Sequence, residues 1–468
     1  MEIKEFLQNE FKTNVFENQS NQKVWLSWYR NNNPWRNYWV TLANAKRSRK
    51  KMTRLSLNSC KRVCEDWANL LLNEKTDIVS ADKKQNDLLQ KVFEENDFWQ
   101  LANNAVEKNQ AIGGGAFVLS KTNEGKITIE YVDGTRCYVL RCDNNEVIDC
   151  AFENKIIVDG DKYTVLSVHI RDDESSQYTI KNYMFDKDMK RVSDQSMMEL
   201  INTEPEVPST IKAFSFFAPQ NVSRDNWDTP FGDSVYAKAI DANKLIDLAF
   251  DSYGNEFKLG KKRIFVATEL ATYERVVETG KDGEKSRTVR VPTFDENETV
   301  FDLLPQDAKG ENYIKEVDME LRTEAHERGI QNSLNYFASL CGLGEKYYTY
   351  EKGGIKTATE VVSENSTLFR NIQKQQVPIE RMLKEVCEAI LGLNNITEIA
   401  ELTVEFDDSI IVDREAERQR DLIDVREGIM SKAEYRAKYY GEAIEKAQEA
   451  IDNIEKANKE NELNKFLV

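Results

Sequence analysis

The side chains that could carry acid–base or nucleophilic chemistry are few and scattered along this 468-residue sequence. Its two histidines are His169, in a strand-like run without Cys, Asp or Ser partners in register, and His326, within a helix-like run. No Ser-His-Asp, Cys-His or H-E-x-x-H arrangement occurs, so the common hydrolase mechanisms lack their residues. We expect no enzyme, and the pattern leaves a carboxylate-dependent enzyme as the alternative.

Two adjacent carboxylate pairs, Asp172–Asp173 and Asp407–Asp408, are the candidates for such chemistry. Neighbouring residues of a strand point to opposite faces, so neither pair is suited to share one ion. Cys60 lies one helical turn before Cys64, but no histidine or second cysteine pair is near enough to complete four ligands. The seven cysteines are scattered and odd in number. We therefore expect buried, reduced thiols, no metal and no cofactor.

Three consecutive glycines, Gly113 to Gly115, resemble part of a phosphate-binding loop. In a P-loop or a G-x-G-x-x-G fingerprint, a strand precedes the glycines. Here a helix-like run precedes them and a strand-like run follows. This order predicts a helix-to-strand turn and no nucleotide site.

Composition favours a protein of several parts with extended, solvated helices. The length predicts two to four domains, and the chain is 40% hydrophobic and 31% charged. It has no apolar run of about 18 residues and no secretion signal at its N-terminus, so we expect no membrane association. The formal net charge of −17 has the wrong sign for tight binding to nucleic acid, which depends on Lys and Arg.

The first 54 residues are rich in tryptophan and then in basic side chains. Trp25, Trp28, Trp35 and Trp39 are expected to dock on the rest of the fold or on a neighbouring subunit, with a base-stacking platform as the alternative. The basic cluster of residues 46–54 could contact phosphate, but a solvated linker is the simpler interpretation.

Apolar periodicity predicts helices on both sides of an antiparallel β region. The expected helices span residues 53–73, 85–96, 98–112, 234–256 and 313–340. The expected strands span residues 116–120, 126–131, 137–141, 155–158, 163–169 and 178–185, with hairpin turns at Asp133-Gly134 and Asp159-Gly160. A proline-rich linker is expected at 203–232 and a small β module at 258–312.

The longest periodic run follows a segment rich in glycine and tyrosine, residues 342–356. Thr357 and Glu360 form a capping box at its start, and Gly392 is expected to close the helix. Pro378 lies inside the run and predicts a kink, because proline removes a backbone donor and clashes with the preceding turn.

The segment after Gly392 predicts one strand that returns to a sheet formed far upstream, and then a helical C-terminal region. Ser431 and Glu434 form a second capping box. The last expected helix has a narrow apolar stripe that suits packing against another helix, formed by Ile444, Ala447, Ile451 and Ile454.

The order of these parts resembles the portal proteins of tailed bacteriophages, of the kind found in long-tailed phages and prophages. The resemblance covers nearly the whole chain. Its most specific pieces are CEDWANLLLNEK, FGDSVYAKAIDANKLIDLAFDS, LNYFASLCGLGEKYYTYEKGGIKTATEVVSENS and DREAERQRDLIDVREGIMSKAEYR. None is a signature by itself, and the identification depends on their order and spacing.

The resemblance implies an α+β, multidomain portal fold that assembles as a ring. Residues 1–232 would form an α/β wing together with the returning strand of 394–412. Residues 233–257 and 313–341 would be the two stem helices, with the small β-containing clip at 258–312 between them. Residues 342–356 would be the tunnel loop, 357–393 the tunnel helix kinked near Pro378, and 413–468 a helical crown, which is short in this chain.

The same resemblance implies a ring of about twelve subunits at one capsid vertex of the virion, assembled in the bacterial cytoplasm, through which double-stranded DNA is packaged and ejected. The implied partners are the terminase, a head-completion or connector protein, and the major capsid and scaffolding proteins. The candidates for facing DNA are Lys346, Lys352, Gly353, Gly354 and Lys356, with a merely solvated loop as the alternative. The candidates for contact with terminase or adaptor are Lys258, Lys261, Lys262 and Arg263, with a solvated strand edge as the alternative.

A ring-forming head or tail protein that does not conduct DNA is the other interpretation of the resemblance. Such a protein would lack a mobile loop at its narrowest point, so the properties of residues 342–356 distinguish the two.

Overall fold

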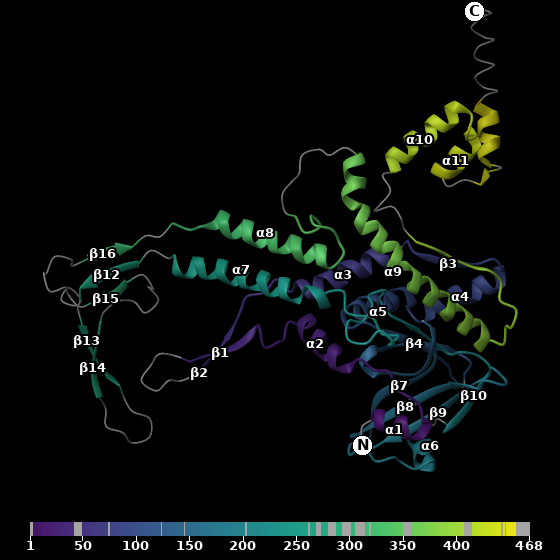
Figure 1. Ribbon diagram of the computed structural model, residues 1–468, viewed down its shortest axis with the longest axis horizontal. Coiled ribbons are helices and arrows are strands. Elements are labelled where there is room, and N and C mark those ends of the chain that lie inside the picture. Colours follow the sequence, from purple (N-terminus) through teal and green to yellow (C-terminus); the bar gives the residue numbers. More distant parts are fainter. Residues whose placement is uncertain are drawn as a thin grey trace, which may run out of the picture.

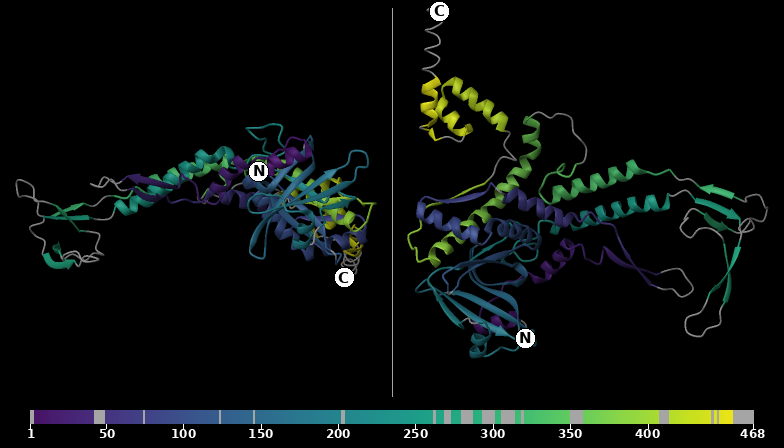
Figure 2. Two further views of the ribbon diagram at one scale, coloured as in Figure 1. Left: turned by 90° about the horizontal axis from the view of Figure 1, so that it is seen from below. Right: turned by 180° about the vertical axis from the view of Figure 1, so that it is seen from behind.

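The computed structural model describes residues 3–41, 49–73, 75–122, 124–144, 146–201, 204–260, 263–267, 273–278, 287–292, 301–304, 314–317, 320–349, 358–406, 414–440, 443–444 and 446–454. These residues form a body from which a long two-helix arm projects, with short strands at the far end of the arm (Figure 1). Two short helices near the C-terminus lie apart from both (Figures 1 and 2). The mixture of helices and strands confirms the expected α+β class.

One part of the body is a five-stranded antiparallel sheet in the order β10-β9-β8-β7-β6. Its strands are β6 (Cys137–Asp143), β7 (Glu146–Val158), β8 (Asp161–Arg171), β9 (Tyr178–Phe185) and β10 (Glu206–Ser209), and α6 (Asp194–Ile201) precedes the last. Helix α1 (Ile3–Phe11) buries Phe6 and Leu7 in one cluster with sheet residues such as Leu166. A three-stranded sheet, β11-β4-β5, covers the cluster that includes Phe152 and Phe214. Its strands are β4 (Gly115–Lys121), β5 (Ile127–Asp133) and β11 (Phe214–Phe217).

The other part of the body is helical and contains the largest hydrophobic cluster. Its helices are α2 (Gln19–Tyr29), α3 (Ser59–Leu71), α4 (Lys83–Glu95), α5 (Phe98–Ile112) and α9 (Ala358–Leu393). Trp25 and Trp28 are buried in this cluster, and the Tyr236 hydroxyl donates to the Trp25 carbonyl over 2.9 Å. This burial confirms docking of the first two tryptophans on the rest of the fold.

Close backbone contact explains the three glycines. Helix α5 ends at Ile112 and β4 begins at Gly115, which confirms the helix-to-strand turn. Gly113 has φ +81°, and a Cβ added there would lie 2.0 Å from the Gly232 carbonyl oxygen. The Gly232 amide donates to the Gly113 carbonyl over 2.8 Å, so two chain segments cross where no side chain fits.

The arm is an antiparallel pair of helices, α7 (Ile240–Leu259) and α8 (Thr323–Leu340), which lie side by side in both views (Figures 1 and 2). A short 3-10 turn, η2 (Ala237–Ala239), leads into α7. Arg322 and Glu256 bridge the far ends of the two helices over 2.8 Å. Beyond the helices, β12 (Arg263–Ala267), β15 (Phe301–Leu304) and β16 (Ile314–Val317) form a three-stranded sheet. A separate two-stranded sheet consists of β13 (Tyr273–Glu278) and β14 (Arg287–Pro292). The expected β module is confirmed.

Three expected elements differ in the structure because long-range pairing overrides local pattern. The helix expected at 53–73 begins only at Ser59: Thr53 belongs to β2 (Arg49–Thr53), which pairs with β1 (Asn37–Thr41), and the Leu55 amide donates to the Asp251 side chain. The helix expected at 313–340 begins at Thr323, because β16 pairs with β12. The Asp133-Gly134 hairpin is wrong: a 3-10 turn, η1 (Gly134–Arg136), carries the chain from one sheet to the other. The Asp159-Gly160 hairpin between β7 and β8 is confirmed.

Helix α9 was expected to end at Gly392, but it continues to Leu393. A Cβ on Gly392 would lie 2.6 Å from the Ile211 side chain, so this glycine permits close packing, and Asn395 adopts the positive φ of 61° beyond the helix. The returning strand is confirmed as β17 (Leu402–Glu405), which pairs with β3 (Asp77–Ser80).

The C-terminal region contains α10 (Arg414–Glu427) and α11 (Lys432–Tyr440). The second capping box is confirmed: the Glu434 amide donates to Ser431 Oγ over 3.1 Å, and the Ser431 amide donates to Glu434 Oε2 over 2.8 Å. Beyond it Ala447 is buried, whereas Ile444 and Ile454 are exposed. Among the described residues, no helix combines the length and apolarity needed to cross a bilayer.

Candidate functional site

The chain turns from the arm back into the body at residues 342–349, the described part of the glycine- and tyrosine-rich segment. Gly342 and Gly344 have φ of +84° and +96°, a region that favours glycine. The Asn371 side chain of α9 donates to the Gly342 carbonyl over 2.8 Å. The Trp67 indole of α3 donates to the Cys341 carbonyl over 3.1 Å. Helices α3 and α9 therefore hold both sides of this turn.

Tyr348 anchors the end of the same segment. Its side chain is buried, and its hydroxyl donates to Asp66 Oδ2 over 2.6 Å. The Tyr348 carbonyl accepts from the Gln331 side chain of α8 over 3.1 Å, and the Arg62 guanidinium lies 5.4 Å from the tyrosine ring. Burial raises the pKa of Asp66, although the Tyr348 hydrogen bond opposes this shift. Three helices thus fix residues 342–349.

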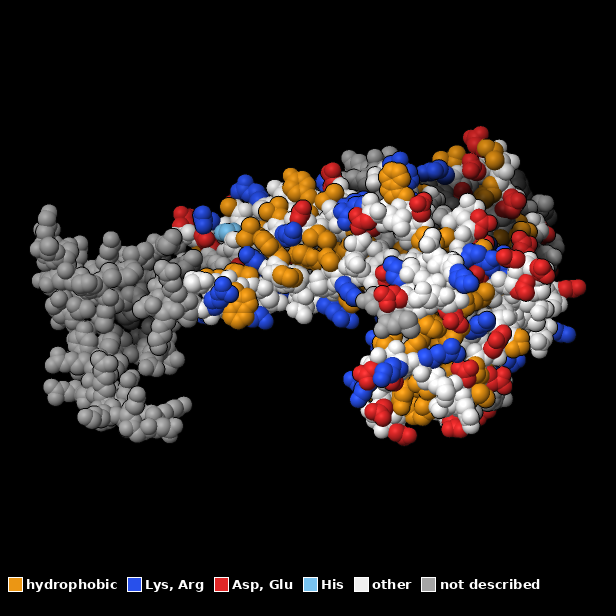
Figure 3. Space-filling view, turned by 60° about the horizontal axis from the view of Figure 1, so that its bottom comes forward, with side chains coloured by type: hydrophobic (Ala, Val, Ile, Leu, Met, Phe, Trp, Pro, Cys, Tyr) orange, Lys and Arg blue, Asp and Glu red, His pale blue; other side chains and the backbone are white. Residues whose placement is uncertain are grey.

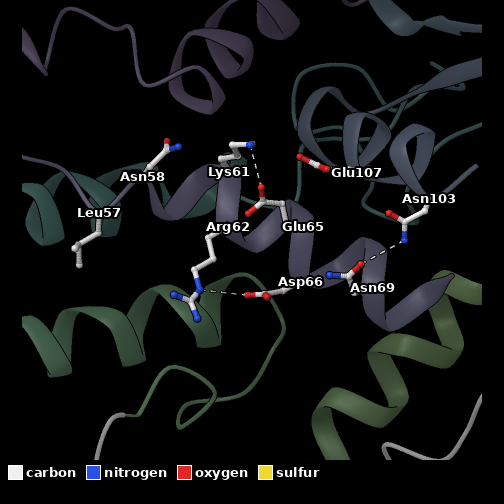
Figure 4. A pocket seen from close by; sticks show the side chains of 9 residues that line it. All are labelled: Leu57, Asn58, Lys61, Arg62, Glu65, Asp66, Asn69, Asn103 and Glu107. Carbon is white, nitrogen blue, oxygen red and sulfur yellow. Dashed lines mark hydrogen bonds and ion pairs between the residues drawn. The ribbon is translucent and has the colours of Figure 1, made fainter. Parts of the chain in front are cut away.

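An open polar pocket of about 640 Å³ lies beside this anchor on α3 and α5 (Figure 4). Its charged side chains are paired: Lys61 with Glu65 over 3.0 Å and Arg62 with Asp66 over 3.9 Å. The remaining lining residues are Leu57, Asn58, Asn69, Asn103 and Glu107. Within the described residues no group of His, Cys, Asp or Glu is placed to hold a metal ion. The pocket offers ion pairs and amides, and no nucleophile paired with a base.

Pro378 lies within α9, which is continuous on both sides of it. The kink expected there stays a prediction. A smaller pocket of about 200 Å³ separates this part of α9 from the loop of residues 216–232. The buried Gln375 side chain bridges the two, because its Oε1 accepts from the Gln220 amide over 2.9 Å. Trp227 of this loop is 82% exposed.

Of the predicted cations, the structure describes Lys346, Lys258 and Arg263, and it places Lys346 far along the chain from the other two. Lys346 is exposed next to the turn at the base of α8, whereas Lys258 is exposed near the far end of α7. Arg263 is the first residue of β12. Lys352, Gly353, Gly354, Lys356, Lys261, Lys262 and the capping residue Thr357 lie outside the described residues.

The candidate catalytic groups that the structure describes do not form a site, and Asp407 and Asp408 lie outside the described residues. Asp172 accepts from the backbone amide of Glu174 over 2.7 Å, and Asp173 pairs with Arg141. His169 is buried with aromatic rings at its edges, as a core histidine. His326 lies 3.5 Å from Glu256. All seven cysteines are free, and all but the half-buried Cys142 are buried, as expected.

Sequence reasoning missed the anchor made by Asp66, Tyr348 and Trp67. Tyr348 lies 282 positions after Asp66 along the chain, and each of the three residues occupies an ordinary place in its own helix or loop. The only local signal was Gly342 and Gly344, which mark a turn with positive φ.

Comparisons with known proteins place the chain in a family. Two similar solved structures are described as "Neck of native GTA particle computed with C12 symmetry" and "Neck of empty GTA particle computed with C6 symmetry". The first is 12% identical with a TM-score of 0.43, covering 91% of this chain and 94% of that one. The second is 12% identical with a TM-score of 0.42, covering 90% and 94%. No curated protein matches the chain. The sequence model of the family described as "Phage portal protein, SPP1 Gp6-like" matches residues 8–462, and this chain therefore belongs to that family of phage portal proteins.

Proposed function

We propose that copies of this chain form a closed ring of about twelve subunits at one vertex of a phage capsid. Double-stranded DNA passes through this ring during packaging and ejection, and terminase and head–tail connector proteins dock on it. The observation that carries the proposal is the portal-family match over residues 8–462. The partners also include major capsid and scaffolding proteins.

The order of elements supports an assignment of each region of the chain to one part of a portal subunit. The α7–α8 arm corresponds to the stem, and the strands between these helices correspond to the clip. Residues 1–232 and 394–412 form the wing, α9 is the tunnel helix, 342–356 is the tunnel loop and 413–468 is the crown. In support of this assignment, β17 returns to pair with β3 of the body after α9 has ended.

The negative charge of the chain suits a channel through which DNA slides rather than a protein that binds DNA tightly. At −17 per copy, a ring of about twelve carries about 200 negative charges, while DNA presents one charge per ~1.7 Å of its axis. Repulsion between the two prevents strongly bound positions along the path, so the duplex can slide. The sequence has no Walker motif, so the energy for packaging comes from the terminase.

The anchored segment of 342–349 gives the tunnel loop a fixed starting point near Lys346. We assign Lys346, Lys352 and Lys356 to contact with DNA, with Gly353 and Gly354 between them. We assign Lys258, Lys261, Lys262 and Arg263, at the far end of the arm, to contact with terminase or the connector.

Native mass spectrometry of the purified protein, followed by class averages of single particles, tests the ring. We expect one closed species near twelve copies with a central hole. A stable monomer or dimer that persists in the presence of capsid protein would contradict the proposal.

DNA passage is tested with Lys346→Ala/Lys352→Ala/Lys356→Ala rings built into proheads. We expect less nuclease-protected DNA than with wild type. The matched control is Lys83→Ala/Lys84→Ala/Lys126→Ala, which removes three exposed lysines of the body and should package normally. Equal packaging by both variants would remove the assignment of these lysines to DNA.

A further inference from the structure

A long stretch near the N-terminus has a charge opposite to that of the whole chain. Residues 18–64 contain eleven Lys and Arg and no Asp or Glu, although the chain has 81 acidic residues and a net charge of −17. The remaining residues therefore carry a net charge of −28. The β1–β2 ribbon lies inside this acid-free stretch, which is complementary in charge to the rest of the subunit surface.

The ribbon has little cover from its own chain. Trp39 is 65% exposed, Val40 and Met52 are also exposed, and every residue of β2 is exposed. Trp39 pairs in register with Lys51, and Val40 with Lys50. Among the described residues, none forms a hydrogen bond or ion pair with the side chains of Arg49, Lys50 or Lys51. An isolated two-stranded ribbon is marginally stable in water, so contact with a further surface would stabilise this one.

The residues at the base of the ribbon, 35–38 and 54–55, are in contrast held in place; we call them the ribbon root. The Arg54 guanidinium lies 4.0 Å from the Trp35 ring and 4.0 Å from the Tyr38 ring. The Leu55 amide donates to Asp251 Oδ1 of α7 over 3.0 Å, and Gly254 of α7 leaves room for the Leu55 side chain. The ribbon therefore projects from α7 in a set direction, alongside the arm (Figure 1), and binding needs no ordering of its root.

The arm carries an apolar stripe that its own ribbon is not placed to cover. Hydrophobic side chains gather on the face of the arm that Figure 3 shows. On α7, Leu245 and Leu248 are 47% and 45% exposed. At 100° per residue, the middle of the stripe formed by these two leucines and Asp241 lies about 120° around α7 from the middle of the face formed by Asp251 and Gly254, which hold the base of the ribbon. The exposed Asp241 accepts from Lys244 over 2.8 Å, and its second carboxylate oxygen remains to accept another cation.

We propose that the β1–β2 ribbon of each subunit docks on the α7 stripe of an adjacent copy of this chain. Trp39 packs on Leu245 and Leu248, and Lys51 lies beside Asp241. The pairing of an aromatic and a cation with two leucines and a carboxylate covers both apolar surfaces and offsets charge. This inference rests on the proposed ring, because only a closed ring gives every ribbon a receiving stem.

Disulfide cross-linking tests the contact without removing it. Thr41→Cys places a thiol on the Trp39 face of the ribbon, and Ser252→Cys places one on the exposed stripe of α7; both positions are exposed. Because six of the seven natural cysteines are buried, mild oxidation acts mainly on the introduced thiols. The double variant should give a ladder of covalent multimers up to the ring size, and each single variant alone should give none.

Mixing the two single variants before assembly distinguishes contacts between copies from contacts within one copy. We expect covalent heterodimers from the mixed ring. Rings that assemble but give no heterodimer, or a double variant that cross-links only within one chain, would overturn the docking and leave the proposed ring standing. A protein that forms no ring would instead contradict the proposed function.

Charge reversal on the ribbon distinguishes two possible binding partners of the β1–β2 ribbon: a neighbouring subunit and DNA. Lys50→Glu/Lys51→Glu should raise the protein concentration needed for ring assembly by at least about tenfold, whereas the matched reversal Lys83→Glu/Lys84→Glu on α4 should not. Retention of a short DNA duplex is measured on the same samples. Unchanged assembly with loss of duplex retention would assign the ribbon to DNA and overturn the proposal.

Discussion

The five-stranded sheet and the β1–β2 ribbon are both antiparallel β structures, but only the sheet is covered by its own chain. Helix α1 packs on one face of the sheet, and the β11-β4-β5 sheet packs near the other, so Leu166, Phe152 and Phe214 are buried. The ribbon exposes Trp39 and all of β2. One subunit therefore contains both a β structure whose apolar faces are buried by its own chain and a β structure whose side chains stay exposed.

The largest expected effect is on the sheet. Phe214 is fully buried, and its ring lies 5.4 Å from those of Phe152 and His169. Phe214→Ala should lower the free energy of unfolding of this part by about 4 kcal/mol, because it removes buried area and leaves a cavity. Urea unfolding with hydrogen exchange of β7 and β8 as the readout measures this loss. A change below about 1 kcal/mol would show that the two sheets do not depend on each other.

Acid should destabilise the sheet and not the ribbon. Burial lowers the pKa of His169 to about 4, below the ordinary value of 6.5, so the unfolded chain binds the proton more readily. The stability that this group contributes is complete above pH 6.5 and is lost as the pH falls from there toward 4, by on the order of 3 kcal/mol.

The matched variant is His169→Phe, which keeps an aromatic ring between Phe152 and Phe214. Its unfolding free energy, measured at several pH values, should fall less steeply than that of wild type between pH 6.5 and 4. Parallel curves for the two proteins would mean that His169 is not the group that titrates.

The junction between arm and body should show a smaller effect. Tyr348→Phe removes the hydroxyl that donates to Asp66 and leaves that half-buried carboxylate without this partner. We expect a loss of about 1–2 kcal/mol, visible as faster hydrogen exchange at residues 342–349. Tyr347→Phe, at the exposed neighbouring tyrosine, is the control and should leave exchange unchanged.

The smallest effect on the isolated subunit is expected in the ribbon. Trp39→Ala should change the unfolding free energy of the monomer by no more than about 0.5 kcal/mol, because the side chain is largely exposed. The same change should weaken ring assembly. Trp227→Ala removes another exposed tryptophan outside the ribbon and should leave assembly unchanged. Large destabilisation of the monomer by Trp39→Ala would show that the ribbon packs on its own subunit.

Local signals predicted many elements well. Helix α5 spans the residues expected for it, 98–112, and β9 spans 178–185, because an amphipathic period or an alternating run with clear ends specifies each. The Ser431–Glu434 box likewise marks a helix start that depends on four residues only. The order of segments was enough to indicate the portal family.

The sequence-based predictions were wrong where pairing with a distant strand decides the local structure. Residues 314–317 have an apolar pattern that continues into α8, yet they pair with β12, and residues 49–53 pair with β1. The Asp133-Gly134 dipeptide suits a hairpin, but the strands on its two sides belong to different sheets. The anchor of Tyr348 on Asp66 joins residues 282 positions apart, so no local pattern contains it.

By itself, the sequence determined the helical and strand periods, the expectation of buried thiols, a structural rather than a catalytic place for His169, and the net negative charge, because each depends on residue types and short spacings. Only the tertiary structure decided which strands pair, that residues 342–349 are held by three helices, and that the basic ribbon projects uncovered beside the arm. These features depend on which distant surfaces meet, and that is set by the packing of the whole chain.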